Sequence, residues 1–241
     1  MKKLYVISLL FIIGSLLGCC SLDNLGNIIT VKGNGNVITS EKTVSSFEKI
    51  NIGSGAEVRF YASRDYRTIV TVDSNLLEYI EIDTRGDTLN IGTKNENFSF
   101  TKYLVEVYCP AVNSVSVSGS GRFYGMNKIN VSTFTSNVLG SGMIEGTIES
   151  ETFSAKISGS GKITVIGNSK DLDIDISGSG SFNGSEFGIN KASVRINGSG
   201  EANVNVSEYL DANISGSGVI NFYGNPKIDY KVSGSGRLKK L

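Results

Sequence analysis

The chain has 241 residues, and its 23 basic side chains balance its 23 acidic ones. It contains no histidine, which removes His-based catalytic triads and most zinc sites from consideration. Because basic residues are neither in excess nor clustered, we do not expect nucleic acid as a partner. Three cysteines are too few for a disulfide framework, and we expect neither a metal nor another cofactor.

The first residues have the features of a bacterial secretion signal. Lys2 and Lys3 precede an apolar run from Leu4 to Leu17, which is too short for a comfortable membrane span. We therefore assign residues 1–18 to a signal peptide and exclude them from the fold.

The next residues suggest a lipid anchor. Leu16-Leu17-Gly18-Cys19 resembles the lipobox of secreted lipoproteins. That resemblance implies cleavage between Gly18 and Cys19, a lipid on the thiol of Cys19 and a tether over residues 19–27. An ordinary secretory signal with incidental cysteines is the alternative. The expected partner is a membrane, and the expected location is the cell envelope, at the outer membrane or cell surface.

Residues 28–110 have an irregular β pattern, which we expect to form a cap and the first rungs of a longer domain over residues 28–241. A short helical turn is predicted over residues 74–78. Gly53-Ser54-Gly55 resembles a later repeated triplet, but Asn51 stands where that repeat has an aliphatic residue. Short strands are indicated by apolar residues spaced two apart, at Val58 and Phe60, Val70 and Val72, and Ile80 and Ile82.

Arg85-Gly86-Asp87 spells the integrin-binding tripeptide at the tip of a hairpin predicted over residues 82–89. A turn that needs glycine between two polar residues explains the same letters without any ligand. Cys109 ends the apolar strand 104–108, and we expect a buried, inert thiol there.

Residues 111–241 are organised by a repeat, since Gly-Ser-Gly recurs at intervals of 21, 19, 19, 20, 18 and 18 residues. Two residues before each triplet stands a β-branched aliphatic residue, and four residues after its first glycine stands an apolar one. The first column is Val117, Val138, Ile157, Ile176, Ile196, Ile214 and Val232; the second is Phe123, Ile144, Ile163, Phe182, Ala202, Ile220 and Leu238. Each repeat therefore predicts a strand, a sharp corner, a second strand and a looser turn.

The paired glycines are interpreted as structural corners, because glycine adopts positive φ angles without a Cβ clash. A phosphate-binding loop is the alternative at Gly159-Ser160-Gly161-Lys162, but Ile163 stands where that motif needs Ser or Thr. The predicted corner residues are Gly119, Gly121, Gly140, Gly142, Gly159, Gly161, Gly178, Gly180, Gly198, Gly200, Gly216, Gly218, Gly234 and Gly236.

A repeat of this length cannot bury its inward face alone, but stacked copies can. The predicted fold is therefore all-β: a single-stranded parallel β-helix, or β-solenoid, with rungs of about 18–21 residues. Outward columns should form polar ladders, in which Lys156, Asp175 and Arg195 lie on successive rungs with alternating charge.

Candidate ligand-binding residues are few. Asp171, Asp173 and Asp175 project from one predicted strand and suggest either a solvated face or a calcium or sugar-cleaving site. Tyr124 and Tyr223 are candidates for stacking on a sugar or protein, with incidental exposure as the alternative.

The sequence resembles the GIN-domain family of auto-transporter adhesin heads over roughly residues 28–238. The resemblance implies a right-handed β-helix exposed at the cell envelope, without an established biochemical role. It is carried by the Ser-Gly-Ser-Gly corners, Val44-Ser45-Ser46-Phe47-Glu48-Lys49-Ile50, Asn75-Leu76-Leu77-Glu78, Thr88-Leu89-Asn90-Ile91 and Cys109-Pro110.

We accordingly expect a non-catalytic envelope lipoprotein: an adhesin-like or structural module that presents a rigid β-helix to a glycan or to a host or envelope protein. The alternatives are a carbohydrate-active enzyme that uses surface carboxylates, and a protein that self-assembles through its last rung. Arg237, Lys239 and Lys240 on that rung resemble protection of a strand edge, so the oligomeric state is left open.

Overall fold

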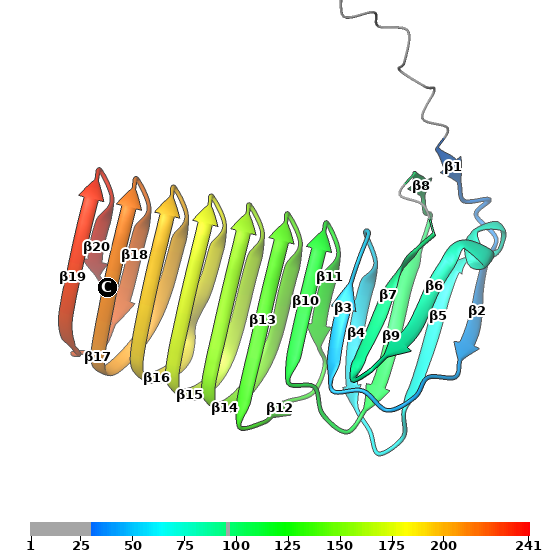
Figure 1. Cartoon of the computed structure of the whole chain (residues 1–241), viewed down its shortest axis with the longest axis horizontal. Coiled ribbons are helices and arrows are strands. Elements are labelled where there is room, and N and C mark those ends of the chain that lie inside the picture. The colour runs from blue at the N-terminus through cyan, green and yellow to red at the C-terminus, as the bar shows by residue number, and fades with distance from the viewer. Residues whose placement is uncertain (1–29, 95–96) are drawn as a thin grey trace, which may run out of the picture.

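The computed structural model describes residues 30–94 and 97–241 (Figure 1). The predicted signal peptide, the Gly18–Cys19 cleavage site and the tether over residues 19–27 lie outside these described residues. Within them, the secondary structure is 20 strands and one short 3-10 helix. No helix in the described ranges is both long enough and apolar enough to cross a membrane.

The strands stack as parallel coils along one axis, which confirms the predicted all-β parallel solenoid (Figure 1). Corner glycines lie over one another: Gly140 is in register with Gly159, and Gly159 with Gly178. The regular coils are formed by β10 (Ser114–Gly119), β11 (Arg122–Gly125), β12 (Ile129–Asn130), β13 (Thr133–Gly140), β14 (Met143–Gly159), β15 (Lys162–Gly178), β16 (Ser181–Gly198), β17 (Glu201–Gly216), β18 (Val219–Tyr223), β19 (Lys227–Gly234) and β20 (Arg237–Lys240).

The N-terminal part continues the two walls of the solenoid and then closes them with antiparallel strands. β3 and β7 extend one wall and β4 and β9 the other, all in parallel, after which β6, β5 and β2 pair antiparallel. The predicted helical turn is present as η1. The elements are β1 (Val31–Lys32), β2 (Val37–Lys42), β3 (Lys49–Ile52), β4 (Glu57–Ala62), β5 (Arg67–Asp73), η1 (Ser74–Tyr79), β6 (Ile80–Arg85), β7 (Thr88–Thr93), β8 (Phe98–Ser99) and β9 (Tyr103–Cys109).

The two predicted aliphatic columns form the dry interior. In the first column every member from Val117 to Ile214 is at most 1% exposed. Val232, in the last coil, is 37% exposed because no further coil packs on it. Burial of these stacked side chains is the main favourable contribution to the fold.

The corners need two glycines for two different reasons. Gly159 has φ +116°, and a Cβ there would also lie 2.6 Å from the carbonyl oxygen of Gly140 in the preceding coil. Gly161 has no such φ, but its Cβ would lie 2.3 Å from Cγ1 of Val138. The first glycine therefore makes the turn, and the second lets the corner close against the aliphatic column.

The strand pairing defines two details of the predicted repeat. The far turn is less regular than the corner, as predicted: β14 to β17 run through it as continuous strands and β14 stays paired with β15, but the register shifts there between β15 and β16 and between β16 and β17. The N-terminal triplet is out of register with the other seven, as predicted, because Ile52 pairs with Val117 and the triplet is therefore shifted by one residue. Its corner position is taken by Ser54, which adopts φ +61° in place of a glycine.

A buried carboxylate holds the N-terminal closure together. Asp73 is fully buried at the end of β5, where it accepts hydrogen bonds from the backbone N–H of Gly35 at 2.9 Å and of Thr101 at 2.8 Å. Burial alone would favour the neutral acid, but these N–H donors hold the pKa of Asp73 below its usual value. The side chain thereby joins the loop before β2, the end of β5 and the loop before β9.

Candidate functional site

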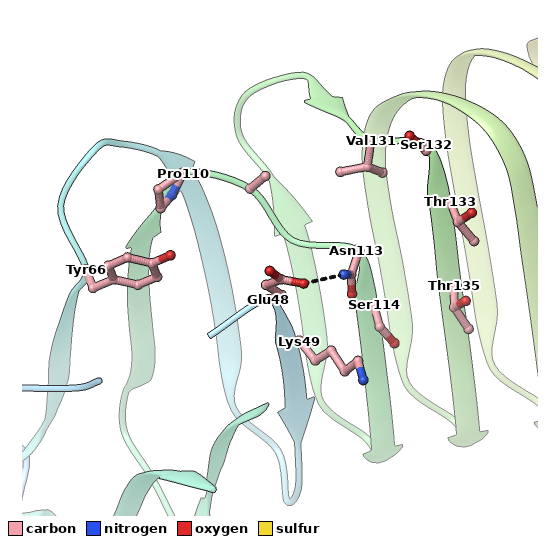
Figure 2. A pocket seen from close by; sticks show the side chains of 11 residues that line it. Glu48, Lys49, Tyr66, Pro110, Asn113, Ser114, Val131, Ser132, Thr133 and Thr135 are labelled. Carbon is pink, nitrogen blue, oxygen red and sulfur yellow. Dashed lines mark hydrogen bonds between the residues drawn. The ribbon is translucent and has the colours of Figure 1, made fainter. Parts of the chain in front are cut away.

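A hollow of about 620 Å³ lies where the irregular coils meet the regular ones (Figure 2). In Figure 2, Tyr66 and Pro110 lie on one side of it and Val131, Ser132 and Thr133 on the other. Its volume falls in the range of small-molecule sites in proteins. The full lining is Glu48, Lys49, Tyr66, Pro110, Ala111, Asn113, Ser114, Val131, Ser132, Thr133 and Thr135.

The floor of the hollow is set by strand register. Lys49, Ser114 and Thr135 are aligned across three neighbouring strands, and each alternates with buried residues, so all three face outward. The backbone N–H of Thr135 donates to the carbonyl of Asn113 at 2.9 Å, which fixes the segment that leads from β9 into β10. The floor is therefore part of the rigid solenoid wall.

Polar contacts orient the groups at the centre. Asn113 Nδ2 donates to Glu48 Oε2 at 2.9 Å, and the Asn113 backbone N–H donates to the Glu48 carbonyl at 2.8 Å (Figure 2). Lys49 Nζ lies 2.9 Å from Asp87 Oδ2, and this hydrogen-bonded pair raises the pKa of Lys49 and lowers that of Asp87. The ammonium group already has a counter-ion, so the hollow does not present an uncompensated positive charge.

Tyr66 supplies an aromatic surface. Its ring packs edge-to-face on Phe47, with centroids 5.5 Å apart, and Phe47 is 1% exposed. Tyr66 itself remains 37% exposed. A buried ring thus supports an exposed one beside a row of hydroxyl groups.

This arrangement suits recognition better than chemistry. Ser114, Thr133 and Thr135 offer hydroxyl groups, Asn113 an amide and Glu48 a carboxylate, all of which match the hydroxyl groups of a sugar or the backbone of a peptide. Within the described ranges, no three His, Cys, Asp or Glu side chains come together as metal ligands.

The structure places Arg85, Gly86 and Asp87 at the tip of the β6–β7 hairpin, with Gly86 at φ +62°. The Arg85 guanidinium pairs with Asp83, and the Asp87 carboxylate is held by Lys49 and by the Thr88 hydroxyl at 3.0 Å. Both charged groups of the tripeptide therefore have partners within the chain.

Asp171, Asp173 and Asp175 lie on the outer side of β15, as alternation predicts, and do not converge on a common point. Arg195 lies opposite Asp175, yet it hydrogen-bonds Asp173 at 2.8 and 3.0 Å. The long side chain of Arg195 reaches diagonally along the sheet. The predicted alignment of Asp175 with Arg195 is therefore correct, but the ion pair forms with Asp173 instead.

Tyr124 and Tyr223 do not form one aromatic platform. Tyr124 aligns with Glu145 of β14, whereas Tyr223 aligns with Asn205 of β17, and four strands separate the two along the stack. At roughly 4.8 Å per strand, a single sugar cannot contact both rings.

Cys109 is fully buried and has no disulfide, as expected for an inert thiol. Burial raises the pKa of its thiol to about 12. The thiolate that reacts with electrophiles is therefore scarce at neutral pH.

Sequence reasoning missed the hollow. Its walls come from the segments around Tyr66, Asn113 and Ser132, which lie far apart in the sequence and share no motif. The only signal was a break in regularity, because the interval from Gly119 to Gly140 is the longest of the repeat. The two extra residues lie between Tyr124 of β11 and Ile129 of β12, because the offset to β14 falls from 21 to 19 residues there.

The fold and the site together define a repetitive parallel β-solenoid with a polar outer surface and an aromatic-lined hollow beside Tyr66. The chain belongs to the family described as "Putative auto-transporter adhesin, head GIN domain", whose model matches residues 46–226. A comparison with curated proteins finds no match.

Solved structures share the fold. A protein of Parabacteroides distasonis described as a "putative lipid binding protein" is 27% identical with a TM-score of 0.74, over 88% of this chain and 100% of its own. A Bacteroides fragilis protein described as a "putative adhesin" is 19% identical with a TM-score of 0.80, over the same shares of the two chains. A "putative adhesin" of Parabacteroides merdae is 24% identical with a TM-score of 0.73, over 88% of this chain and 99% of its own.

Proposed function

We propose that this protein is a non-catalytic, adhesin-like module of the cell envelope that binds a glycan in the hollow beside Tyr66. The observation that carries the proposal is the combination of an exposed aromatic ring, supported by Phe47, with outward hydroxyl and amide groups on a rigid wall. Aromatic faces stack on the apolar side of sugar rings, while hydroxyl and amide groups bind their edges.

A glycan fits the hollow better than an anionic ligand does. Lys49 is neutralised by Asp87, and Glu48 is oriented by Asn113 as a hydrogen-bond acceptor. Neutral sugars are recognised by such oriented hydrogen-bonding groups. The family description and the adhesins among the similar structures support a location at the cell surface.

The proposal includes anchoring through a lipid on Cys19. With an acyl-chain contribution of about 0.8 kcal/mol per buried CH₂, more than one chain holds a protein stably at a bilayer. The expected result is palmitate labelling of the native chain and its loss in Cys19→Ser. An unlabelled native chain would remove the anchor but leave glycan binding unaffected.

The direct test of ligand class is a glycan array that also carries extracellular-matrix proteins. A soluble form that begins at Ser21 keeps every described element and omits the lipidation site. Binding to one group of related glycans supports the proposal. Binding confined to matrix proteins, or retention of nothing on the array, contradicts it.

Catalysis receives no support from the acids. Asp173 is bound to Arg195, and Asp171 and Asp175 lie along one strand without convergent neighbours. Prolonged incubation with any glycan retained on the array should leave it uncleaved, and release of shorter products would favour the enzyme alternative instead.

A further inference from the structure

The last coil of the solenoid is uncovered. Among the described strands, β19 pairs only with β17, and β20 only with β18, so the outer backbone edges of both strands have no strand partner (Figure 1). Unpaired edges of this kind are templates for pairing with another chain.

Core side chains are exposed at the same end. Ile228, Tyr230 and Val232 are 37%, 62% and 37% exposed, although their register partners in β17 are almost completely buried. A hollow of about 790 Å³ lies against Tyr230 and Val232, with Leu238 also in its lining. The end therefore presents a cross-section of the hydrophobic core together with unsatisfied strand edges.

The hydrophobic core is covered at the opposite end of the solenoid, although β2 and β6 each have only one partner among the described strands. η1 and the start of β6 cover the core there, with Leu76 at 0% and Ile80 at 7% exposure. Head-to-tail stacking would have to displace this closure. A partner that covers the last coil of one copy is therefore better supplied by the last coil of another.

The sequence of β19 is self-complementary in antiparallel pairing. When two copies of β19 pair about Tyr230, Ile228 lies opposite Val232, and Asp229 lies opposite Lys231. Inward residues then meet inward residues, and opposite charges face each other twice, which stabilises cross-strand pairs.

The neighbouring registers are worse. A register centred on Asp229 or on Lys231 places that charged residue opposite its own copy, which is destabilising. A register that mixes inward and outward positions would expose apolar side chains and bury charged ones. Pairing about Ile228 also places Lys227 opposite Asp229, but it joins only residues 227–229 of β19, whereas pairing about Tyr230 joins residues 227–233 and satisfies both the pattern of burial and the pattern of charge.

We propose that a second copy of this chain covers the last coil, tail to tail, through antiparallel pairing of β19 about Tyr230. Such a two-fold contact closes on itself and stops at a dimer. The basic residues Arg237, Lys239 and Lys240 of β20 lie at the contacting end of each copy, and the repulsion between these two basic groups makes the association reversible. The contact is independent of the hollow beside Tyr66, so either proposal can fail without the other.

The test is sedimentation of the soluble form over a wide range of concentrations. The expected result is a monomer–dimer equilibrium that Asp229→Lys weakens by at least about tenfold, because two like-charge contacts replace two pairs. The double change Asp229→Lys with Lys231→Asp should restore association, since the reversed pairs face each other again. Asp211→Lys, in the same outward column one coil earlier, is the matched control and should have no effect.

A second readout fixes the register. Tyr230→Cys places two thiols opposite each other at a strand separation that a disulfide can span, and the only other cysteine in the soluble form is buried. Oxidation should give a covalent dimer, whereas the control Tyr223→Cys should not. The proposal would be overturned by a monomer at all concentrations or by an open-ended polymer. It would also be overturned by a dimer whose association changes neither with Asp229→Lys nor with the double charge swap.

Discussion

A Cβ atom on Gly161 would lie 2.3 Å from Cγ1 of Val138, which belongs to the coil before it. The same relation recurs at later corners, where the second glycine faces the β-branched residue that the preceding coil contributes to the aliphatic column. The strict pairing of Gly-Ser-Gly with an aliphatic residue two positions earlier is thus a packing requirement between successive coils. It explains why the repeat is regular where the stack is regular.

Gly161→Ala should destabilise the fold by about 1–3 kcal/mol, because the added methyl group overpacks the corner against Val138 and against backbone that cannot move freely. Urea unfolding measures the change. Gly146→Ala is the matched control, since its Cβ would meet only backbone atoms at ordinary contact distance, 3.7 Å or more. Equal effects of the two substitutions would contradict the close packing of the corner.

Asp73→Asn should lower the melting temperature at neutral pH, because it weakens the hydrogen bonds that the Asp73 carboxylate accepts from the backbone N–H groups of Gly35 and Thr101. The folded chain holds the pKa of Asp73 below 3.8, so its contribution is present above that pH and is lost as the pH falls through the folded-state pKa. The difference between native chain and variant should therefore shrink in acid. A difference that stays constant from pH 7 to strong acid would show that the carboxylate charge is not what stabilises the closure.

Cys109 should resist thiol reagents at neutral pH until the chain is unfolded. Its folded-state pKa of about 12 exceeds the ordinary value of 9.0, so its neutral thiol stabilises the fold below pH 9, and that contribution is lost as the pH rises toward 12. Stability of the soluble form should fall over this range less steeply in Cys109→Ala than in the native chain. Identical slopes, or rapid labelling of the folded chain, would contradict the burial of the thiol.

The regular part of the fold could be predicted because its physics is local and repeated. A β-branched residue two positions before each glycine pair is enough to set which face is buried. The N-terminal corner could not be placed, because Ser54 does with a strained backbone what glycine does elsewhere. Arg195 was assigned to the wrong aspartate because register fixes neighbours but does not fix where a long side chain reaches.

The hollow was beyond sequence reasoning for a different reason. Tyr66, Asn113 and Ser132 have no pattern in common, and they meet only because two loops and an enlarged turn lie on adjacent coils. Repeat position therefore pointed to Tyr124 and Tyr223, which are only half-buried side chains of the outer wall, and not to Tyr66, the ring that lines the hollow.

The most direct test of the proposed function is the affinity of Tyr66 variants for a glycan retained on the array. Tyr66→Ala should weaken binding at least about tenfold, as loss of a central aromatic anchor does, while Tyr66→Phe keeps the ring and should retain most of the affinity. Tyr223→Ala is the matched control, and it should bind like the native chain. If Tyr66→Ala binds as tightly as the native chain, or if Tyr223→Ala loses binding to the same extent, the ligand does not occupy the hollow and the proposed function is wrong.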